Sequence, residues 1–187
     1  MRTMAAGEEK SQEIWTVGHS TRSLEDFKLI LNSQGIQTLA DVRAYPVSRR
    51  YPHFNKEVLK VSLNSVGIEY QQLPALGGRR SVSQNSRNIA WKNPSFRAYA
   101  DYMETNEFKT GIKELMKLST LCPTAVMCAE AVWWRCHRSL IADYLKAQGW
   151  IVTHILSAKK TELHPYTSAA SIIDGELSYR GLLSKAG

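Results

Sequence analysis

The sequence predicts a single α/β domain with a five-stranded, mostly parallel, doubly wound sheet and helices on both faces. Three segments share one pattern: a stretch with helical periodicity ends at a glycine, and a short β-rich run follows at once. A helix that feeds a buried strand, repeated along the chain, is typical of parallel sheets. The length of 187 residues suits one domain, and the hydrophobic fraction of 43% is ordinary for a protein with a core.

Each expected strand has its own local signal. The segment EIWTVGHS opens the fold, the segment TAVMCAE follows Pro123, and the other three follow Gly35, Gly67 and Gly149. Those glycines stand where a helix C-cap favours a left-handed residue. The expected strands are residues 13–18, 37–43, 68–73, 124–129 and 150–156. Because crossovers between parallel strands are right-handed, we expect the order 3-2-1-4-5, with the first and fourth strands adjacent.

The helices and loops complete this organisation. Ser23 and Asp26 fit a capping box for the first helix, and a helical stretch over 95–118 is expected to break near Thr105. The polar, Gly- and Ser-rich stretch 77–93 predicts a long basic loop, of the kind that often serves binding. The expected boundaries are a disordered extension over 1–12, the domain over 13–167 and a tail over 168–187.

Composition excludes several classes of protein. Five Trp, eight Tyr and four Phe are too many for a disordered chain, and three Cys do not suggest a disulfide framework. The first residues have no apolar segment typical of a secretory signal, and no apolar run is long enough to span a membrane. A cytoplasmic protein without membrane contact is therefore expected; its oligomeric state is left open.

Positive charge is concentrated in the middle of the chain. Residues 43–97 contain ten basic and two acidic residues, a net charge of +8, whereas the whole chain carries +7. Aromatic residues are interleaved with these charges. Basic side chains neutralise phosphates and aromatic faces stack on bases, so the segment favours a phosphate-bearing ligand such as a nucleotide or nucleic acid. A solvated basic surface is the alternative.

Reactive side chains follow the expected strands, at the edge where open α/β sheets bind ligands. We expect His19, Arg43, Cys128, Glu130 and His137 to meet there, with Arg138. The candidate catalytic residues are Cys128, Glu130, His19, His137 and Asp41. The candidate phosphate or nucleic-acid ligands are Arg43, Arg49, Arg50, Arg79, Arg80, Arg138 and Ser20.

The run Cys136-His137-Arg138 is expected at a helix N-terminus, where unpaired N–H groups favour an anion and lower the pKa of a thiol. The competing interpretation is that Cys128 and Cys136 are core residues, because free cysteines are often buried. A metal site is a further alternative, but the C-x7-C-H spacing lacks the short chelate of structural zinc sites. No metal and no cofactor is expected.

Together these segments resemble the domain-of-unknown-function 488 family, a group of uncharacterised bacterial and archaeal proteins. The resemblance runs from about residue 14 to 167 and rests on TVGHS, LADVRAYPVSRRYPHFN, YQQLPALGG, CAEAVWWRCHRSLIADYL and LHPYT. It implies an α/β fold and supplies no reaction. The loop AVWWR departs from the usual pattern by its two Trp. The motif positions that carry over are Gly18, His19, Ser20, Asp41, Arg43, Pro46, Ser48, Phe54, Leu76, Gly77, Gly78, Cys128, Glu130, Cys136, His137 and Arg138.

Three functional hypotheses follow. The first is an enzyme that acts on a nucleotide or nucleic acid, with Cys128 as nucleophile or redox thiol and a histidine as base, or with Glu130 and Asp41 as working carboxylates. The second is a nucleic-acid binder without catalysis, and the third is a Cys/His metal-binding module. Perturbed pKa values in a pocket would favour the first.

Overall fold

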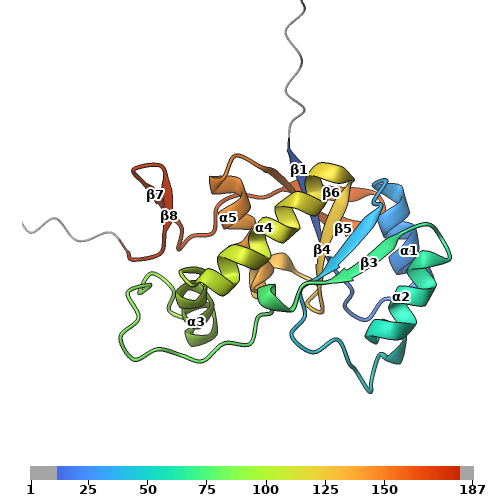
Figure 1. Ribbon diagram of the computed structural model, residues 1–187, viewed down its shortest axis with the longest axis horizontal. Helices are drawn as coiled ribbons and strands as arrows, with labels where there is room; N and C mark the ends of the chain where they lie inside the picture. The colour runs from blue at the N-terminus through green and yellow to red at the C-terminus, as the bar shows by residue number, and fades with distance from the viewer. Residues whose placement is uncertain (1–11, 182–187) are drawn as a thin grey trace, which may run out of the picture.

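The computed structural model describes residues 12–181, which form a six-stranded sheet flanked by helices, together with a two-stranded hairpin (Figure 1). The strands of the sheet are β1 (Glu13–Gly18), β2 (Thr38–Asp41), β3 (Glu69–Gln72), β4 (Thr124–Cys128), β5 (Ile151–Ser157) and β6 (Lys160–Leu163). The hairpin consists of β7 (Ser171–Ile173) and β8 (Glu176–Ser178). The α-helices are α1 (Leu24–Ser33), α2 (Lys56–Asn64), α3 (Pro94–Met103), α4 (Asn106–Leu121) and α5 (Arg138–Ala147). Short 3₁₀ turns are η1 (Pro52–Phe54), η2 (Pro74–Leu76) and η3 (Trp133–Arg135).

The sheet has the order β3-β2-β4-β1-β5-β6, and all neighbours are parallel except β5 and β6. The predicted fold class is confirmed, and so is the adjacency of the first and fourth strands. Two details differ from the expected order 3-2-1-4-5: β4 lies between β2 and β1, and the antiparallel β6 extends the sheet. From β1 the chain adds β2 and β3 toward one edge of the sheet, and it then returns to add β4 and β5. The direction in which strands are added therefore still reverses beside β1 and β4.

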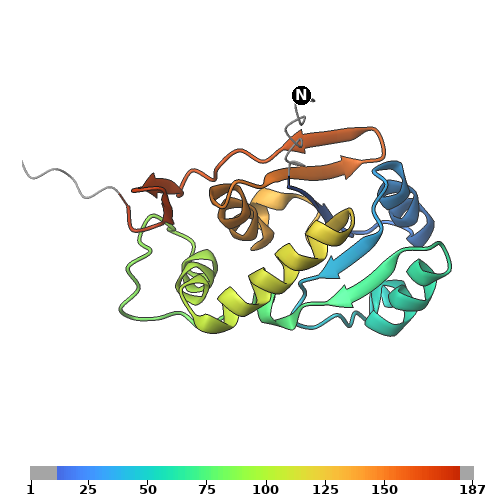
Figure 2. The ribbon, with the colours of Figure 1, turned by 45° about the horizontal axis from the view of Figure 1, so that its top comes forward.

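Helices cover both faces of the sheet, as predicted (Figures 1 and 2). On one face, α3, α4 and α5 pack against a core that includes Val126 and Val152. On the other face, α1 and α2 pack against a core that includes Leu39 and Met127. All five residues of β4 are buried, since this strand lies in the middle of the sheet with helices above and below it.

The helix boundaries follow the local sequence signals. Ser23 caps α1: its hydroxyl accepts a hydrogen bond from the Asp26 amide at 3.1 Å and donates one to the Asp26 carboxylate at 2.8 Å. The helical stretch over 95–118 is divided as expected, because the Thr105 hydroxyl caps α4 by accepting from the Phe108 amide. The glycines expected at helix ends, Gly35, Gly67 and Gly149, all have positive φ.

The segment 77–93 contains no regular helix or strand and runs from η2 to α3 along the side of the molecule where the C-terminal hairpin lies (Figure 1). The Ala90 amide donates to the Tyr179 carbonyl at 3.0 Å, and the buried Tyr179 hydroxyl donates to Asp143 at 2.8 Å. The described part of the C-terminal segment, up to residue 181, is thus fastened to α5. Of the expected extension over 1–12, only Gln12 lies within the described residues.

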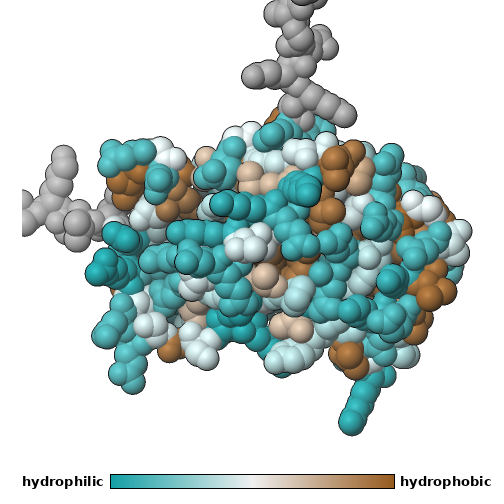
Figure 3. Space-filling view, in the orientation of Figure 1, coloured by the Kyte–Doolittle hydropathy of each residue, from teal (hydrophilic) through white to brown (hydrophobic). Residues whose placement is uncertain are grey.

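The outer surface is mostly hydrophilic on the face seen in Figure 3, and apolar side chains gather at the edge formed by α1 and α2. Leu29, Val58 and Val61 are exposed there. In the part of the chain that the structure describes, no helix combines the length and apolar character needed to cross a membrane.

Candidate functional site

A cavity of about 640 Å³ lies at the carboxyl edge of the sheet, where β2 and β4 end. Its walls come from the loop after β2, the loop after η2, the start of α3, and the connection from β4 to α5. The structure therefore brings together loops that are distant in the sequence, at the edge where the topology predicts a ligand site.

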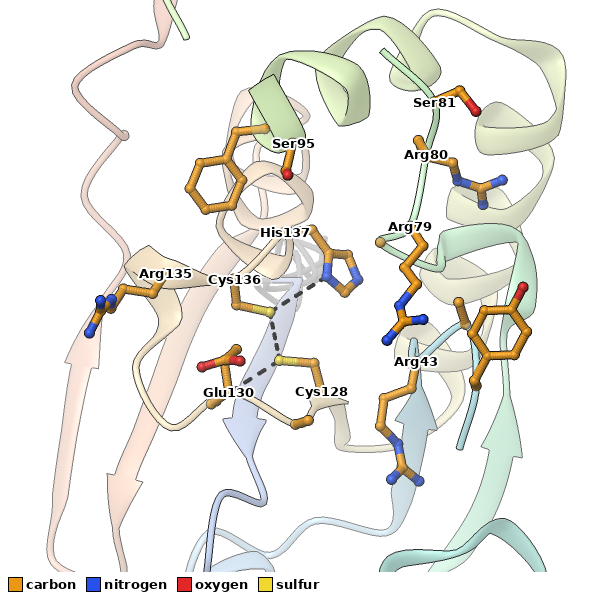
Figure 4. Close-up of a pocket in the computed structure, with 15 residues that line it drawn as sticks. Arg43, Arg79, Arg80, Ser81, Ser95, Cys128, Glu130, Arg135, Cys136 and His137 are labelled. Atoms are coloured by element: carbon orange, nitrogen blue, oxygen red, sulfur yellow. Dashed lines mark hydrogen bonds between the residues drawn. The ribbon is translucent and has the colours of Figure 1, made fainter. Parts of the chain in front are cut away.

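Two cysteines form the floor of this cavity (Figure 4). Cys128 is the last residue of β4, and Cys136 precedes α5; both are almost wholly buried. Their Sγ atoms are 2.6 Å apart and share a hydrogen bond, although both are free thiols. Seven residues lie between them in the sequence, and the turn η3 folds this intervening chain back so that the two side chains meet.

The Arg138 guanidinium supports the Cys128 thiol from beneath the cavity. Its Nη1 donates to Cys128 Sγ at 3.0 Å and to the Val17 and Glu130 carbonyls at 3.0 and 2.8 Å. The chain can approach this closely because residue 18 is glycine: a Cβ there would stand 1.8 Å from the Glu130 carbonyl oxygen. Arg138 is itself buried, so it acts as a fixed positive charge under the sulfur.

The two thiols have different acidities. Burial would raise the pKa of the Cys128 thiol, but the hydrogen bond from Cys136 and the Arg138 charge outweigh it and lower the pKa to about 7. Burial and the neighbouring Cys128 raise the pKa of Cys136 well above its ordinary value. At pH 7 Cys128 is therefore about half ionised, and its thiolate accepts a hydrogen bond from the Cys136 thiol.

His137 forms the next part of the wall. Its Nδ1 lies 3.6 Å from Cys136 Sγ, and its ring packs on Tyr99 with centroids 5.0 Å apart. Its Nε2 is buried and has no hydrogen-bond partner among the described residues. Burial, followed by the Arg138 charge, lowers the pKa of His137 to about 4, so the imidazole is neutral at physiological pH. Gly78 passes so close that a Cβ there would stand 2.4 Å from His137 Nδ1.

The rest of the wall is basic. Arg79 and Arg135 are exposed and have no carboxylate within salt-bridge distance among residues 12–181. Arg80 is folded back: its guanidinium lies 3.4 Å from the centre of the Tyr102 ring and 3.9 Å from Glu107. Glu130 is the single carboxylate that lines the described cavity.

His19, Asp41 and Arg43 form a separate buried network next to the cavity. Arg43 donates through Nε and Nη2 to the Asp41 carboxylate, which also accepts from Tyr70 at 2.6 Å. Arg43 Nη1 lies 3.4 Å from His19 Nε2, and the His19 ring stacks on Phe54. Burial, followed by the Arg43 charge, lowers the pKa of His19 to about 4. This network anchors the loop after β2, and Arg43 is its member that reaches the cavity wall.

The sequence-predicted residues thus separate into three groups. Those that line the cavity are Arg43, Arg79, Arg80, Cys128, Glu130 and His137. Arg138 contacts Cys128 from below, and the His19 amide donates to the Cys128 carbonyl at 3.0 Å while its side chain turns toward Phe54. Those that do not line the cavity also include Ser20, Asp41, Arg49 and Arg50.

Several wall residues were not among the candidate site residues, namely Arg135, Ser81, Ser95, Tyr45 and Phe96. Tyr45 and Phe96 do belong to the aromatic residues interleaved with the basic segment. Arg135 stands directly before the Cys136-His137-Arg138 run, and that position was an available signal. The two Trp of the departing loop have different roles. Trp133 is buried and stacks on His154, which fixes η3 to β5, whereas Trp134 is exposed.

Across the described part of the chain, no group of three or more His, Cys, Asp or Glu is arranged to hold a metal ion.

Comparison with known proteins adds one match. The model of the family described as "Domain of unknown function DUF488" matches residues 23–145, which include β2, β4 and the start of α5 with its Cys-His-Arg run. No curated protein and no solved structure matched the chain.

Proposed function

The chain belongs to the DUF488 family, whose function is unknown, and we propose from its own site that it is an enzyme acting on a phosphate-bearing substrate, a nucleotide or a nucleic acid, through the Cys128 thiolate. The observation that carries this proposal is a thiol with a pKa of about 7 on the floor of a basic cavity. Only the thiolate is a nucleophile, so the lowered pKa gives Cys128 reactivity that a core cysteine lacks.

The cavity offers charge for an anionic substrate. Arg79 and Arg135 present guanidinium groups at its wall that make no ion pair within residues 12–181. A guanidinium group can bind two phosphate oxygens at once. The first turn of α3 contributes Ser95, and Arg138 adds a fixed charge below. Among the described lining residues, Glu130 is the single carboxylate that opposes this positive charge.

Two groups could move a proton during such a reaction. The neutral His137 imidazole can accept one. The exposed Glu130 carboxylate lies at the cavity wall and makes no ion pair within residues 12–181. Both line the same cavity as Cys128. General acid–base catalysis would require the substrate proton to lie within hydrogen-bond reach of one of them. His19 and Asp41 support the loop instead.

Protection of Cys128 from alkylation tests the proposal. Iodoacetamide labelling of the native protein would be followed by mass spectrometry, with and without a mononucleotide or a single-stranded oligonucleotide. A bound phosphate ligand should slow labelling of Cys128 and leave labelling of Cys122 unchanged, since Cys122 lies at the opposite edge of the sheet. Lack of protection by either ligand, even at low salt, would refute this function.

Matched charge variants sharpen that test. The double variant Arg79→Ala/Arg135→Ala should weaken oligonucleotide binding and reduce its salt dependence, because fewer counterions are released. Lys117→Ala removes one exposed charge from the last turns of α4, away from the cavity, and should bind like the unmodified protein. Fluorescence anisotropy at two salt concentrations would measure both effects.

Nucleic-acid binding without catalysis is the second candidate, and one observation favours it. Tyr45 is 70% exposed at the cavity wall, and the Arg79 guanidinium lies 5.4 Å from its ring centre. An exposed ring beside a cation suits stacking on a base. The Cys128→Ser variant separates the two candidates. It should still bind the ligand in either case. If the protein is an enzyme, the unmodified protein should change the mass of the ligand and the variant should not.

A further inference from the structure

We infer that Cys128 and Cys136 form a reactive dithiol, which a low-molecular-weight disulfide such as oxidised glutathione converts into an intramolecular disulfide. The proposed function uses Cys128 as a nucleophile but assigns no role to its partner thiol. The dithiol is a modification site in its own right, and its chemistry does not depend on any substrate of the proposed enzyme.

Geometry carries the inference. The two Sγ atoms are in contact at 2.6 Å, so the chain needs no large rearrangement to join them. Both residues line the cavity, which gives a small reagent a path to otherwise buried thiols (Figure 4). The segment between them is anchored: η3 places the buried Trp133 against His154, with ring centroids 4.4 Å apart.

The surroundings assign different roles to the two thiols. Arg138 Nη1 contacts Cys128 Sγ at 3.0 Å, and the Arg138 backbone amide donates to Cys136 Sγ at 3.5 Å. Burial opposes ionisation of both, but the Cys136 hydrogen bond and the guanidinium lower the pKa of Cys128, whereas the pKa of Cys136 is raised. Cys128 is therefore the attacking thiol, and Cys136 is the resolving thiol.

The exchange proceeds in two balanced steps. The Cys128 thiolate attacks one sulfur of the low-molecular-weight disulfide, forms a mixed disulfide and displaces one thiolate. Cys136 then gives up its proton and attacks Cys128 Sγ, which forms the internal disulfide and displaces the second thiolate. The protein loses two electrons and two protons, and the oxidised reagent becomes two thiols. An excess of a reducing dithiol reverses both steps.

Closure of the disulfide removes the Cys128 thiolate from the cavity. This consequence rests on the proposed function: an enzyme that needs that thiolate would be inactive when oxidised and would recover on reduction. The disulfide itself can be detected without any assay of activity, so the two proposals can fail separately.

The test treats the native protein with oxidised glutathione at neutral pH and maps the trapped peptides by mass spectrometry. We expect a Cys128–Cys136 disulfide while Cys122 remains unmodified, although Cys122 is the more exposed thiol. The variant Cys136→Ser should stop at glutathione bound to Cys128, because the resolving thiol is missing. Cys122→Ser is the matched control and should form the internal disulfide at an unchanged rate.

Two results would overturn the inference. One is glutathione attached to Cys122 in preference to Cys128. The other is the absence of a Cys128–Cys136 disulfide in a sample whose circular dichroism shows that it is folded. A Cys128–Cys136 disulfide that forms only in denaturant would also overturn the inference, because it would form in the unfolded chain and not in the folded site.

Discussion

Replacing Arg138 with methionine removes the charge that the structure places beneath Cys128. The side chain is buried and makes three carbonyl contacts, to Val17, Glu130 and Ala131, in addition to its contact with the sulfur. Methionine fills similar space without a charge or a donor. The variant should therefore raise the pKa of Cys128 toward its ordinary value of 9.0.

The size of the effect follows from the fraction of thiolate. At pH 7 a thiol with a pKa of about 7 is about half ionised, whereas one with a pKa of 9.0 is only about 1% ionised, a ratio of roughly 50. The less acidic thiolate is intrinsically about tenfold more nucleophilic, which offsets part of this loss. If the pKa returned fully to 9.0, alkylation of Cys128 at pH 7 would slow by roughly fivefold; the Cys136 hydrogen bond remains in the variant, so this is the upper limit of the expected change. Folding should weaken by about 2–5 kcal/mol, since buried carbonyls lose their donor.

The assay measures iodoacetamide labelling rates by mass spectrometry, with Cys122 as the internal reference and a urea titration to confirm folding. Arg138→Lys keeps the positive charge but lacks the planar guanidinium group. Its Cys128 labelling rate should therefore lie between those of the unmodified protein and the methionine variant. Equal Cys128 rates in the folded methionine variant and the unmodified protein would refute the electrostatic reasoning. A faster rate in the variant would mean that Arg138 only restricts access.

Two further predictions concern the same edge of the sheet and its core. Gly78→Ala should displace the His137 ring, because the new Cβ would stand 2.4 Å from Nδ1. We expect the free energy of unfolding, measured by urea titration, to fall by about 1–3 kcal/mol. An unchanged urea midpoint would show that the loop accommodates the methyl group without strain. Acid should destabilise the fold, since burial lowers the pKa of His19 and His137 to about 4 and that of His154 to about 2. In the unfolded chain these histidines are protonated near the ordinary pKa of 6.5, whereas in the folded protein they stay neutral to lower pH. The free energy of unfolding therefore falls as pH decreases from about 6.5 toward 4, by up to about 1.4 kcal/mol per pH unit for each histidine. Urea midpoints that stay constant over this range would contradict the assignment.

Much of the fold could be predicted because local signals agree with it. Helix caps, glycines after helices and short apolar runs each identify an element, and their repetition indicates a parallel sheet. The position of β4 between β2 and β1 could not be predicted. Both central strands are largely buried, so their burial pattern does not distinguish the two orders. The edge strand β6 is short and exposed, and its sequence KTEL carries no hydrophobic alternation.

The site shows the same division. Topology alone placed Cys128 and the start of α5 at one edge, which suffices to predict that the cysteines are close. It does not fix side-chain directions: the His19 amide bonds to the Cys128 carbonyl, yet its ring turns to Phe54. The ion pair between Arg43 and Asp41 likewise depends on the conformation of the loop after β2, which the spacing of the two residues in the sequence does not predict. Arg135 was missed although it directly precedes the Cys136-His137-Arg138 run, because only the folded loop brings it to the cavity wall.

The pH profile of Cys128 alkylation in the native protein tests the central claim most directly. The measurement follows iodoacetamide labelling of each cysteine by mass spectrometry across the neutral range. A cavity that holds a thiolate predicts a Cys128 rate that rises with pH to a plateau, with its midpoint near 7. A Cys128 that remains unlabelled at every pH until the protein unfolds would contradict the claim and leave the two cysteines as packing residues.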